Sequence, residues 1–441
     1  MNLPNIVLFV TDDHGPWAIG SYGNPDVRTP TLDFLARRGV RFAHAFASAP
    51  ICSSARASLL TGTMPSQHGI HDWLREDEPA VGGRDWLADQ RTLQQHLTKL
   101  GYRCMYVGKW HLGRSSSPAP GFAEWFSVPQ PQGGHSGRQW YSDHGTLVEH
   151  NEYKTTVLTD AAVGFLRACG PDAPFLLVVS YIGTHASDHQ PERLVAPYRQ
   201  ASITPTWDAA APYRGAVSPR ERLNQYYAAV THIDEGVGRI LDVLDSLGSL
   251  DRTAIVYTSD HGTAMGQRGV WGKGNGTRPR NMFEYSLAVP LIWSGPESVQ
   301  GGRVLDVLVD HRHVHSTLLD LVGIPRSPDA SPSFRPLLEG IPQVWDDAVY
   351  SEYGPVRAIR TATHKLVARQ GHGSDELYDL RHDPWEQTNL LAQPDPPSDI
   401  TARLSAQLNG FFATHERPET TGLRFDPDSR GVTAEHVRNL A

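Results

Sequence analysis

The chain has 441 residues, and 40 basic against 48 acidic side chains give it a formal net charge of −8. This balance excludes a global basic field of the kind that recruits nucleic acid or an anionic membrane. Three cysteines (Cys52, Cys104 and Cys169) are too few for a disulfide scaffold and favour a reducing compartment. We therefore expect neither nucleic acid nor a membrane as a partner.

The first residues lack the basic start and the long apolar run of a signal peptide, since only residues 6–10 are continuously apolar. The apolar run at residues 175–179 is likewise far shorter than the roughly 20 residues of a membrane-spanning helix. We expect a cytoplasmic protein, or a periplasmic or secreted one if a signal was removed from the sequence.

Apolar, strand-like segments alternate with helical patterns over most of the chain, which is typical of βαβ units. In chain order these are a strand at 6–10, helices at 31–41 and 91–100, strands at 102–107 and 175–181, a long helix at 222–247, and strands at 253–258 and 288–293. Short, wholly apolar strands favour a mostly parallel sheet sandwiched by helices. We interpret Asp234, within the long helix, as a buried hydrogen-bonding anchor.

The amino-acid composition of the sequence changes after Pro325. Residues 327–336 are rich in Pro and Ser, and short strand candidates follow at 348–352, 356–361, 365–368 and 376–379. This spacing predicts a small antiparallel sheet. We therefore predict an α/β domain at residues 1–325 and a smaller α+β domain at 326–441, whose polar tail from Pro418 is expected to wrap loosely or to be partly disordered.

Four polar clusters follow the ends of predicted strands, where open α/β sheets bind their ligands. They are Asp12-Asp13-His14, Gly108-Lys109-Trp110-His111, Thr184-His185 and Ser259-Asp260-His261-Gly262. Each cluster alone is more typical of a turn or a helix cap, but four at one edge favour a site. The carboxylates of Asp12, Asp13 and Asp260 would repel one another without a cation, and a divalent ion is the simplest compensation.

A fifth cluster, at residues 51–62, puts Cys52 before a predicted short helix and Arg56 four residues later. A helix N-terminus and a guanidinium group both favour an anion beside Cys52. A buried, inert cysteine fits the composition equally well.

Together these motifs resemble those of the sulfatase family in the alkaline-phosphatase superfamily. Each match alone is weak, but the set is specific because it follows the family order from about residue 4 to residue 390. The matching segments are residues 4–13, 29–42, 52–62, 108–113, 259–262, 271–274 and 376–390.

The resemblance implies an alkaline-phosphatase-like fold and the hydrolysis of a sulfate ester. It implies that a maturation enzyme oxidises Cys52 to formylglycine, whose hydrate attacks sulfur, and that one divalent metal is bound, with Ca²⁺ expected first and Mn²⁺ as the alternative. The implied metal ligands are Asp12, Asp13, position 52, Asp260 and His261.

The resemblance also implies roles for the remaining polar residues. Arg56 and Lys109 would steady the modified side chain, and Lys109 with Lys273 would bind the sulfate oxygens. His185 would protonate the departing alcohol, and His111 would take a proton from the second hydroxyl of the hydrate.

Three positions depart from the usual family pattern. Ser54 stands where the family usually has Pro or Ala, Ala186 follows His185 without the usual proline, and His261 stands where many sulfatases have Asn. An imidazole tolerates Mn²⁺ better than Ca²⁺. Two alternatives therefore stay open: a phosphonate monoester hydrolase or phosphodiesterase on the same scaffold, and a non-catalytic binder with unmodified Cys52.

The expected substrate is a carbohydrate sulfate or a small organic sulfate, since the loops after His111 and His185 are long enough to form a polar, Trp-lined pocket. Ordinary loop packing explains the candidate substrate-binding residues equally well. These candidates are His71, Asp72, Trp73 and Arg278.

Overall fold

The computed structural model describes residues 3–129, 134–170, 173–207, 213, 215–296, 299–426 and 429–439. Its largest element is an eleven-stranded mixed sheet in the order β11-β2-β12-β8-β1-β7-β3-β4-β5-β6, with β13 paired to β2. Four neighbouring strands at its centre run parallel. They are β8 (Thr253–Ser259), β1 (Asn5–Asp12), β7 (Phe175–Thr184) and β3 (Arg103–Gly108).

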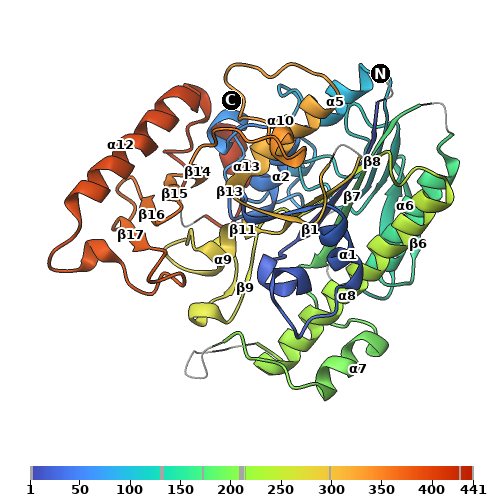
Figure 1. Cartoon of the computed structure of the whole chain (residues 1–441), viewed down its shortest axis with the longest axis horizontal. Coiled ribbons are helices and arrows are strands. Elements are labelled where there is room, and N and C mark those ends of the chain that lie inside the picture. The colour runs from blue at the N-terminus through green and yellow to red at the C-terminus, as the bar shows by residue number, and fades with distance from the viewer. Residues whose placement is uncertain are drawn as a thin grey trace.

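Helices cover both faces of this sheet (Figure 1). Ile6, Leu8 and Val10 of β1 pack in one apolar cluster with α2 (Cys52–Thr61), α5 (Leu93–Thr98) and α10 (His311–Leu321). Val7 and Phe9 point the other way, toward α1 (Pro30–Arg38), α6 (Lys154–Ala168) and α8 (Pro219–Ser246). Because successive side chains of a strand face opposite sides, a wholly apolar strand can bury both faces. The predicted sandwich is confirmed.

The predicted boundaries differ from the structure by up to three residues, and two of the differences have a clear local cause. The helix expected at 31–41 ends at Arg38, because Gly39 closes it and β2 (Val40–Phe46) begins directly afterwards. The strand expected at 288–293 is divided into β11 (Ala288–Val289) and β12 (Leu291–Ser294) at Pro290. A proline has no N–H to contribute to a strand ladder. Both strands also run antiparallel to their neighbours, whereas the sequence predicted buried strands without a direction.

The remaining elements of this domain were not predicted, and neither were β2, α6 and α10. The strands are β4 (Glu124–Ser127), β5 (Gln139–Asp143), β6 (Thr146–His150), β9 (Ala264–Met265), β10 (Trp271–Gly272) and β13 (Arg303–Asp310). The helices are α3 (Pro65–His68), α4 (Pro79–Gly82), α7 (Glu192–Gln200) and α9 (Glu284–Leu287), with short 3₁₀ turns at Pro16–Ala18, Gly20–Tyr22, Gln267–Gly269 and Gly274–Gly276.

The predicted antiparallel sheet follows α11 (Arg335–Leu338) and lies beside the main sheet (Figure 1). Its strands, in spatial order, are β14 (Ala348–Tyr353), β15 (Val356–Thr361), β16 (His364–Ala368) and β17 (Glu376–Asp379). One face of this sheet is covered by α12 (Ser398–His415), whose Leu404, Leu408 and Phe412 are buried. The boundary at residue 325 stays a prediction.

The tail after α12 returns to the main domain. It forms a 3₁₀ turn at Pro418–Thr420 and α13 (Ala434–Asn439), and Val432 pairs with Leu74 in a parallel β-bridge. Residues 427, 428, 440 and 441 of the tail lie outside the described ranges. Among the described residues, no helix combines the length and apolarity needed to cross a membrane.

Candidate active site

Five strands deliver polar residues to one edge of the main sheet. The parallel strands β1, β8, β7 and β3 end at Asp12, Ser259, Thr184 and Gly108, so the residues that follow them lie at the same edge. The segment after β2 leads into α2, whose first residue is Cys52. At the end of β3, Gly108 adopts a φ of 117°, and a Cβ there would lie 1.9 Å from the Ser180 carbonyl oxygen. Only glycine permits this close approach of β3 to β7.

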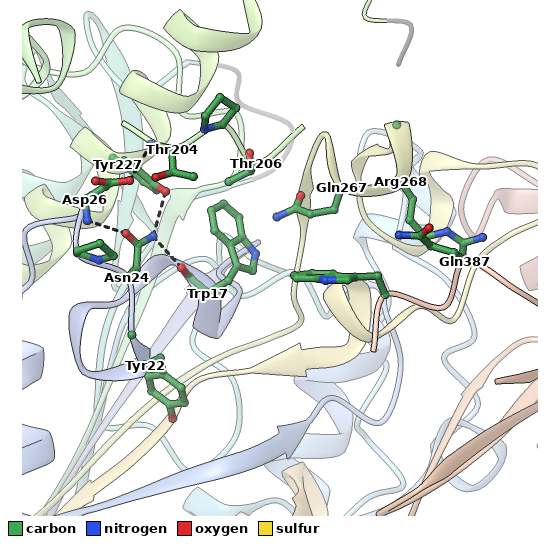
Figure 2. Close-up of a pocket in the computed structure, with 15 residues that line it drawn as sticks. Trp17, Tyr22, Asn24, Asp26, Thr204, Thr206, Tyr227, Gln267, Arg268 and Gln387 are labelled. Atoms are coloured by element: carbon green, nitrogen blue, oxygen red, sulfur yellow. Dashed lines mark hydrogen bonds between the residues drawn. The ribbon is translucent and has the colours of Figure 1, made fainter. Parts of the chain in front are cut away.

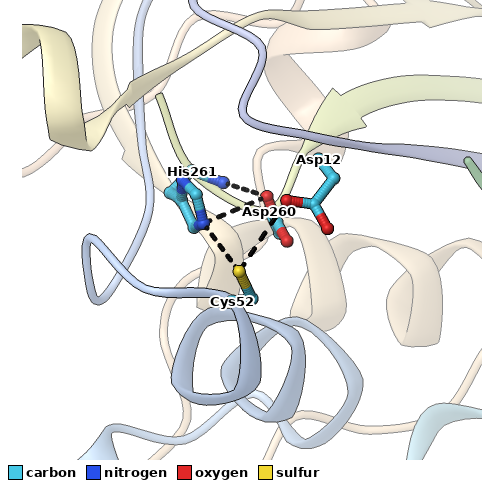
Figure 3. Close-up of side chains that lie close together, drawn as sticks. All are labelled: Asp12, Cys52, Asp260 and His261. Carbon is cyan, nitrogen blue, oxygen red and sulfur yellow. Dashed lines mark hydrogen bonds and ion pairs between the residues drawn. The ribbon is translucent and has the colours of Figure 1, made fainter. Parts of the chain in front are cut away.

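The acidic residues of the site come from the ends of β1 and β8 (Figure 3). The Oδ1 atom of Asp260 accepts hydrogen bonds from the backbone N–H groups of His261, at 2.9 Å, and of Asp13, at 3.3 Å. The side chains of Asp12 and Asp260 are fully buried, and that of Asp13 is 13% exposed. These contacts hold three carboxylates together from segments almost 250 residues apart.

Three cations compensate the three carboxylates. The Arg56 guanidinium lies 3.2 Å from Asp12 Oδ2 and 2.8 Å from Asp260 Oδ2. The Lys109 ammonium pairs with Asp12, and the Lys273 ammonium donates to Asp13 Oδ1 at 2.8 Å. Because each charge has an opposite partner, the cluster can stay ionised although water is nearly excluded.

The pKa values of the cluster follow from this pairing. Burial raises the pKa of Asp12, but Lys109 and the other nearby cations bring it well below its ordinary value. The pKa of Asp13 is also lowered, because Lys273 and His185 outweigh the effect of burial. Conversely, burial lowers the pKa of Lys273 while Asp13 raises it, and the net result is well above the ordinary value.

Cys52 lies among these charges, with its side chain directed at the cluster (Figure 3). Its Sγ is 3.0 Å from Lys273 Nζ, 3.2 Å from His261 Nε2 and 3.7 Å from Asp12 Oδ1. Burial and Asp12 raise the pKa of the thiol, but the opposite effect of Lys109, Lys273 and His261 is larger. The pKa of Cys52 is therefore below its ordinary value. The position therefore favours an anionic group at the N-terminus of α2.

The donor set fits a divalent ion. Atoms of Asp12, Cys52, Asp260 and His261 that can bind a metal all lie within 4.8 Å of one another, and Asp12, Asp13 and His185 form a second such group. Ligands about 2.3–2.6 Å from a common Ca²⁺ ion can be separated by at most about 5 Å. His261 Nδ1 donates to the Gly262 carbonyl at 2.9 Å, and Nε2 faces the cluster. Burial lowers the pKa of this imidazole, but Asp260 raises it, and the net value is about 9, so a metal ion would bind Nε2 by displacing its proton.

The two remaining histidines lie at different depths. His185 follows β7, its ring is 42% exposed, and its Nε2 is 4.0 Å from Asp13 Oδ2. His111 is buried and donates from Nε2 to the Leu74 carbonyl at 3.0 Å, so its neutral ring carries the lone pair on Nδ1. That Nδ1 atom has no hydrogen-bonding partner among the described residues. Burial and Lys109 lower the pKa of His111 to about 4, so the ring is neutral near pH 7.

The structure gives the four candidate substrate-binding residues different surroundings. The Asp72 carboxylate is buried and accepts hydrogen bonds from Arg280 Nη2 and the Tyr353 hydroxyl, each at 2.7 Å. The His71 ring contacts the Thr420 carbonyl at 2.9 Å, and Trp73 packs beside the His111 ring, 6.5 Å between centroids. Arg278 is exposed and donates to the Thr277 carbonyl at 3.0 Å.

Several residues that surround the cluster were missed by the sequence analysis. The Tyr226 hydroxyl donates to the Asp13 carbonyl at 2.8 Å, although the helical spacing predicted only a core residue. Ser180 accepts from Arg56 Nη1 at 2.6 Å and donates to the Lys109 carbonyl at 2.7 Å. Lys154 is 1% exposed, and burial together with Lys109 lowers its pKa to about 8. No motif marked these residues, because each occupies an ordinary core position in its element.

The structure has an alkaline-phosphatase-like fold, and its buried charge cluster is suited to a divalent metal. Residues 4–324 match the sequence model of the sulfatase family. Residues 277–413 match a second family model, described as the N-sulphoglucosamine sulphohydrolase C-terminal region. The chain therefore belongs to the sulfatase family, and it is a sulfuric ester hydrolase. The family implies a divalent metal and formylglycine as its catalytic groups.

Individual relatives agree with this assignment over nearly the whole chain. An N-acetylglucosamine-6-O-sulfatase of Bacteroides thetaiotaomicron is 26% identical, covering 89% of this chain and 83% of the relative. A choline-sulfatase of Rhizobium meliloti is 27% identical, covering 99% and 92%. The structure of BT4656 in complex with its substrate D-glucosamine-2-N,6-O-disulfate has the same fold, with a TM-score of 0.81, 23% identity, and coverage of 97% of this chain and 100% of that one.

Proposed function

We propose that this enzyme hydrolyses a sulfate ester carried by a saccharide, with Cys52 oxidised to formylglycine. One divalent ion would bind beside position 52, with Ca²⁺ preferred and Mn²⁺ as the alternative. The main support is the contact of Cys52 Sγ with Lys273 Nζ and His261 Nε2, at 3.0 and 3.2 Å. These contacts bring a nucleophile position, a cation and a metal-type ligand to one point.

Asp12, Asp13, Asp260 and His261, with the side chain at position 52, would hold the ion. Three carboxylates and the three cations Arg56, Lys109 and Lys273 cancel in formal charge. When bound, the ion would supply the net positive charge and the Lewis acidity that an anionic sulfate group requires.

Formylglycine hydrate would supply a nucleophilic hydroxyl at position 52. Arg56 is bonded to the Lys109 carbonyl, at 2.9 Å, and to Ser180, so its role would be to fix the geometry of the cluster. Lys109 and Lys273 would bind the anionic oxygens of the ester, because both ammonium groups are buried and adjoin Cys52 or Asp12.

The histidines would move protons. His111 presents an unprotonated Nδ1, since its Nε2–H is held by Leu74, and this atom would accept a proton from the side chain at position 52. His185 is partly exposed at the mouth of the site and would donate a proton to the departing alcohol. Trp73, His71 and Arg278 stay candidates for contacts with the sugar, as does Asp72.

A saccharide is favoured over other sulfate esters by the names of several relatives, which act on an N-acetylglucosamine sulfate or on ulvan. The choline-sulfatase relative makes a small organic sulfate the closest alternative. His261 favours a third possibility, a phosphonate monoester hydrolase or phosphodiesterase, because its imidazole replaces the usual amide ligand.

Mass spectrometry of the peptide that contains Cys52 tests the nucleophile, with the chain produced in a host that has a maturation system. We expect formylglycine at position 52, whereas the peptides of Cys104 and Cys169 should keep their thiols and serve as internal controls. An unmodified Cys52 without turnover would favour the non-catalytic alternative.

Parallel kinetics on four esters test the substrate class: a glucosamine 6-sulfate, choline sulfate, an aryl sulfate and an aryl phosphodiester. We expect the highest kcat/KM for the sugar sulfate. A preference of roughly tenfold or more for the phosphodiester would contradict the proposal.

A further inference from the structure

A cavity of about 1030 Å³ opens between the segment after β1, the 3₁₀ turn at Gln267–Gly269 and the loop after β17 (Figure 2). None of its lining residues belongs to the charge cluster around Cys52. Its size lies at the upper end of the range for small-molecule sites, so it can hold a ligand of more than one ring.

One wall of the cavity is formed by aromatic rings that stacking and hydrogen bonds to the backbone hold in place. The Trp17 ring stacks on Tyr226, with 5.2 Å between centroids and 13° between planes, and its Nε1–H donates to the Thr263 carbonyl at 3.0 Å. The Tyr22 hydroxyl accepts from Leu291 N at 2.8 Å. These rings are held in place before any ligand arrives, which lowers the entropic cost of binding.

The opposite wall comes from the loop after β17. Trp385 is 53% exposed and packs against no other aromatic ring in the described part of the chain. Its neighbour Glu386 is fully buried, accepts from Glu284 N at 2.7 Å and pairs with Lys365. Because Glu386 anchors this loop, Trp385 and Gln387 are presented to the cavity from a fixed backbone.

The polar groups of the cavity favour an anionic ligand. Arg268 is exposed at its rim, its guanidinium lies over the Phe283 ring at 4.1 Å, and no carboxylate among the described residues pairs with it. Asp26, the acidic residue of the lining, already accepts from Thr204 N at 2.8 Å. Gln267 and Gln387 add amide groups to the lining (Figure 2).

From this arrangement we infer that the cavity is an accessory binding site for an anionic saccharide segment, separate from the catalytic cluster. Sugar rings offer apolar faces to indoles and hydroxyls to amides. The planar fork of Arg268 matches a sulfate or carboxylate group with two parallel hydrogen bonds. The inference rests on the proposed saccharide substrate, and it adds a second point of attachment on the same chain.

Calorimetric titration of the full chain with a heparin tetrasaccharide tests the inference, in a Cys52→Ala background that prevents turnover. Trp385→Ala and Arg268→Gln should each raise the Kd roughly fivefold or more, since each removes a direct contact with the ligand. Trp140→Ala is the matched control, because Trp140 is 42% exposed and lies on β5, outside the cavity. A desulfated tetrasaccharide should lose the effect of Arg268 and keep that of Trp385.

The inference is overturned if the parent chain does not bind the tetrasaccharide, or if the Trp385 and Arg268 variants bind it within about twofold of the parent. With Cys52 intact, Trp385→Ala should raise the KM for a sulfated tetrasaccharide. Hydrolysis of sulfated sugars with no effect of Trp385 would refute the accessory site alone. Trp385-dependent binding without hydrolysis would refute the proposed function alone.

Discussion

Replacing Lys273 by methionine separates the catalytic from the structural role of a buried ammonium group. Methionine keeps most of the volume of the side chain but removes its charge. The Nζ atom of Lys273 lies 2.8 Å from Asp13 Oδ1, 3.9 Å from Asp12 Oδ1 and 3.0 Å from Cys52 Sγ. The substitution therefore removes a cation from the carboxylates and from the nucleophile position at once.

Lys365 offers a matched control within the same chain. It is fully buried, as its side-chain exposure of 0% shows, and pairs with Glu386 and, at 3.3 Å, with Glu284. It belongs to the antiparallel sheet and not to the charge cluster. Breaking a buried ion pair by removing one partner costs about 3–5 kcal/mol in the free energy of unfolding. We expect a loss of this order in both variants.

The two variants should differ in catalysis. Loss of a group that stabilises developing charge lowers kcat by about 10²–10³, and we expect this for Lys273→Met. The kcat of Lys365→Met should stay within about threefold of the parent, since its contacts do not reach the cluster. The assay is turnover of an aryl sulfate, normalised to the formylglycine fraction and metal content of each preparation. A Lys273→Met enzyme with a kcat like that of Lys365→Met would refute the assigned role.

Three further predictions concern stability. Burial raises the pKa of Glu352 to about 7, so the carboxyl binds a proton more tightly in the native than in the unfolded chain. The free energy of unfolding of the parent should therefore fall by about 3 kcal/mol between pH 4.5 and 7.5. Glu352→Gln should remove this pH dependence in thermal unfolding, and parallel pH curves for parent and variant would contradict the prediction. Chelation should lower Tm, and Ca²⁺ should restore it more fully than Mn²⁺; an unchanged Tm would argue against a tightly bound ion. Asp72→Ala should lower the free energy of unfolding by about 3–5 kcal/mol in denaturant titrations, because the buried charge of Arg280 then loses this partner. A loss below about 1 kcal/mol would mean that the ion pair contributes little to stability.

The sequence predicted the central strands of the main sheet because they are apolar on both faces. Such runs, as in β1 and β7, have few alternatives to a buried parallel strand. The strand β13 was missed, since none of its first five residues is buried: three are partly buried and two are exposed. The helix α12 was missed as well, although Ile400, Leu404, Leu408 and Phe412 recur every four residues and form an apolar stripe that the sequence analysis did not use.

The candidate site was predictable where residues follow strand ends and match family motifs, as Asp12 and Asp260 do. Contacts made by backbone atoms were not predictable, because no side chain identifies them. The Leu74 carbonyl fixes the ring of His111, yet leucine gives no sign of this role in the sequence. The prediction that Asp234 is a buried anchor agrees with its contacts, since it accepts from Thr31 N and Leu32 N at the start of α1.

The return of the C-terminal tail has a practical consequence for anyone who shortens this protein. The family matches end at residue 413, but Val432 exchanges backbone hydrogen bonds with Trp73 and Arg75, and Thr420 holds His71. A version truncated at the family limit would retain every predicted ligand and every strand of both sheets. It would nevertheless lose the hydrogen bonds of Val432 to Trp73 and Arg75, the two residues that flank Leu74. Because the Leu74 carbonyl holds the His111 imidazole, we expect the truncation to loosen the orientation of that ring.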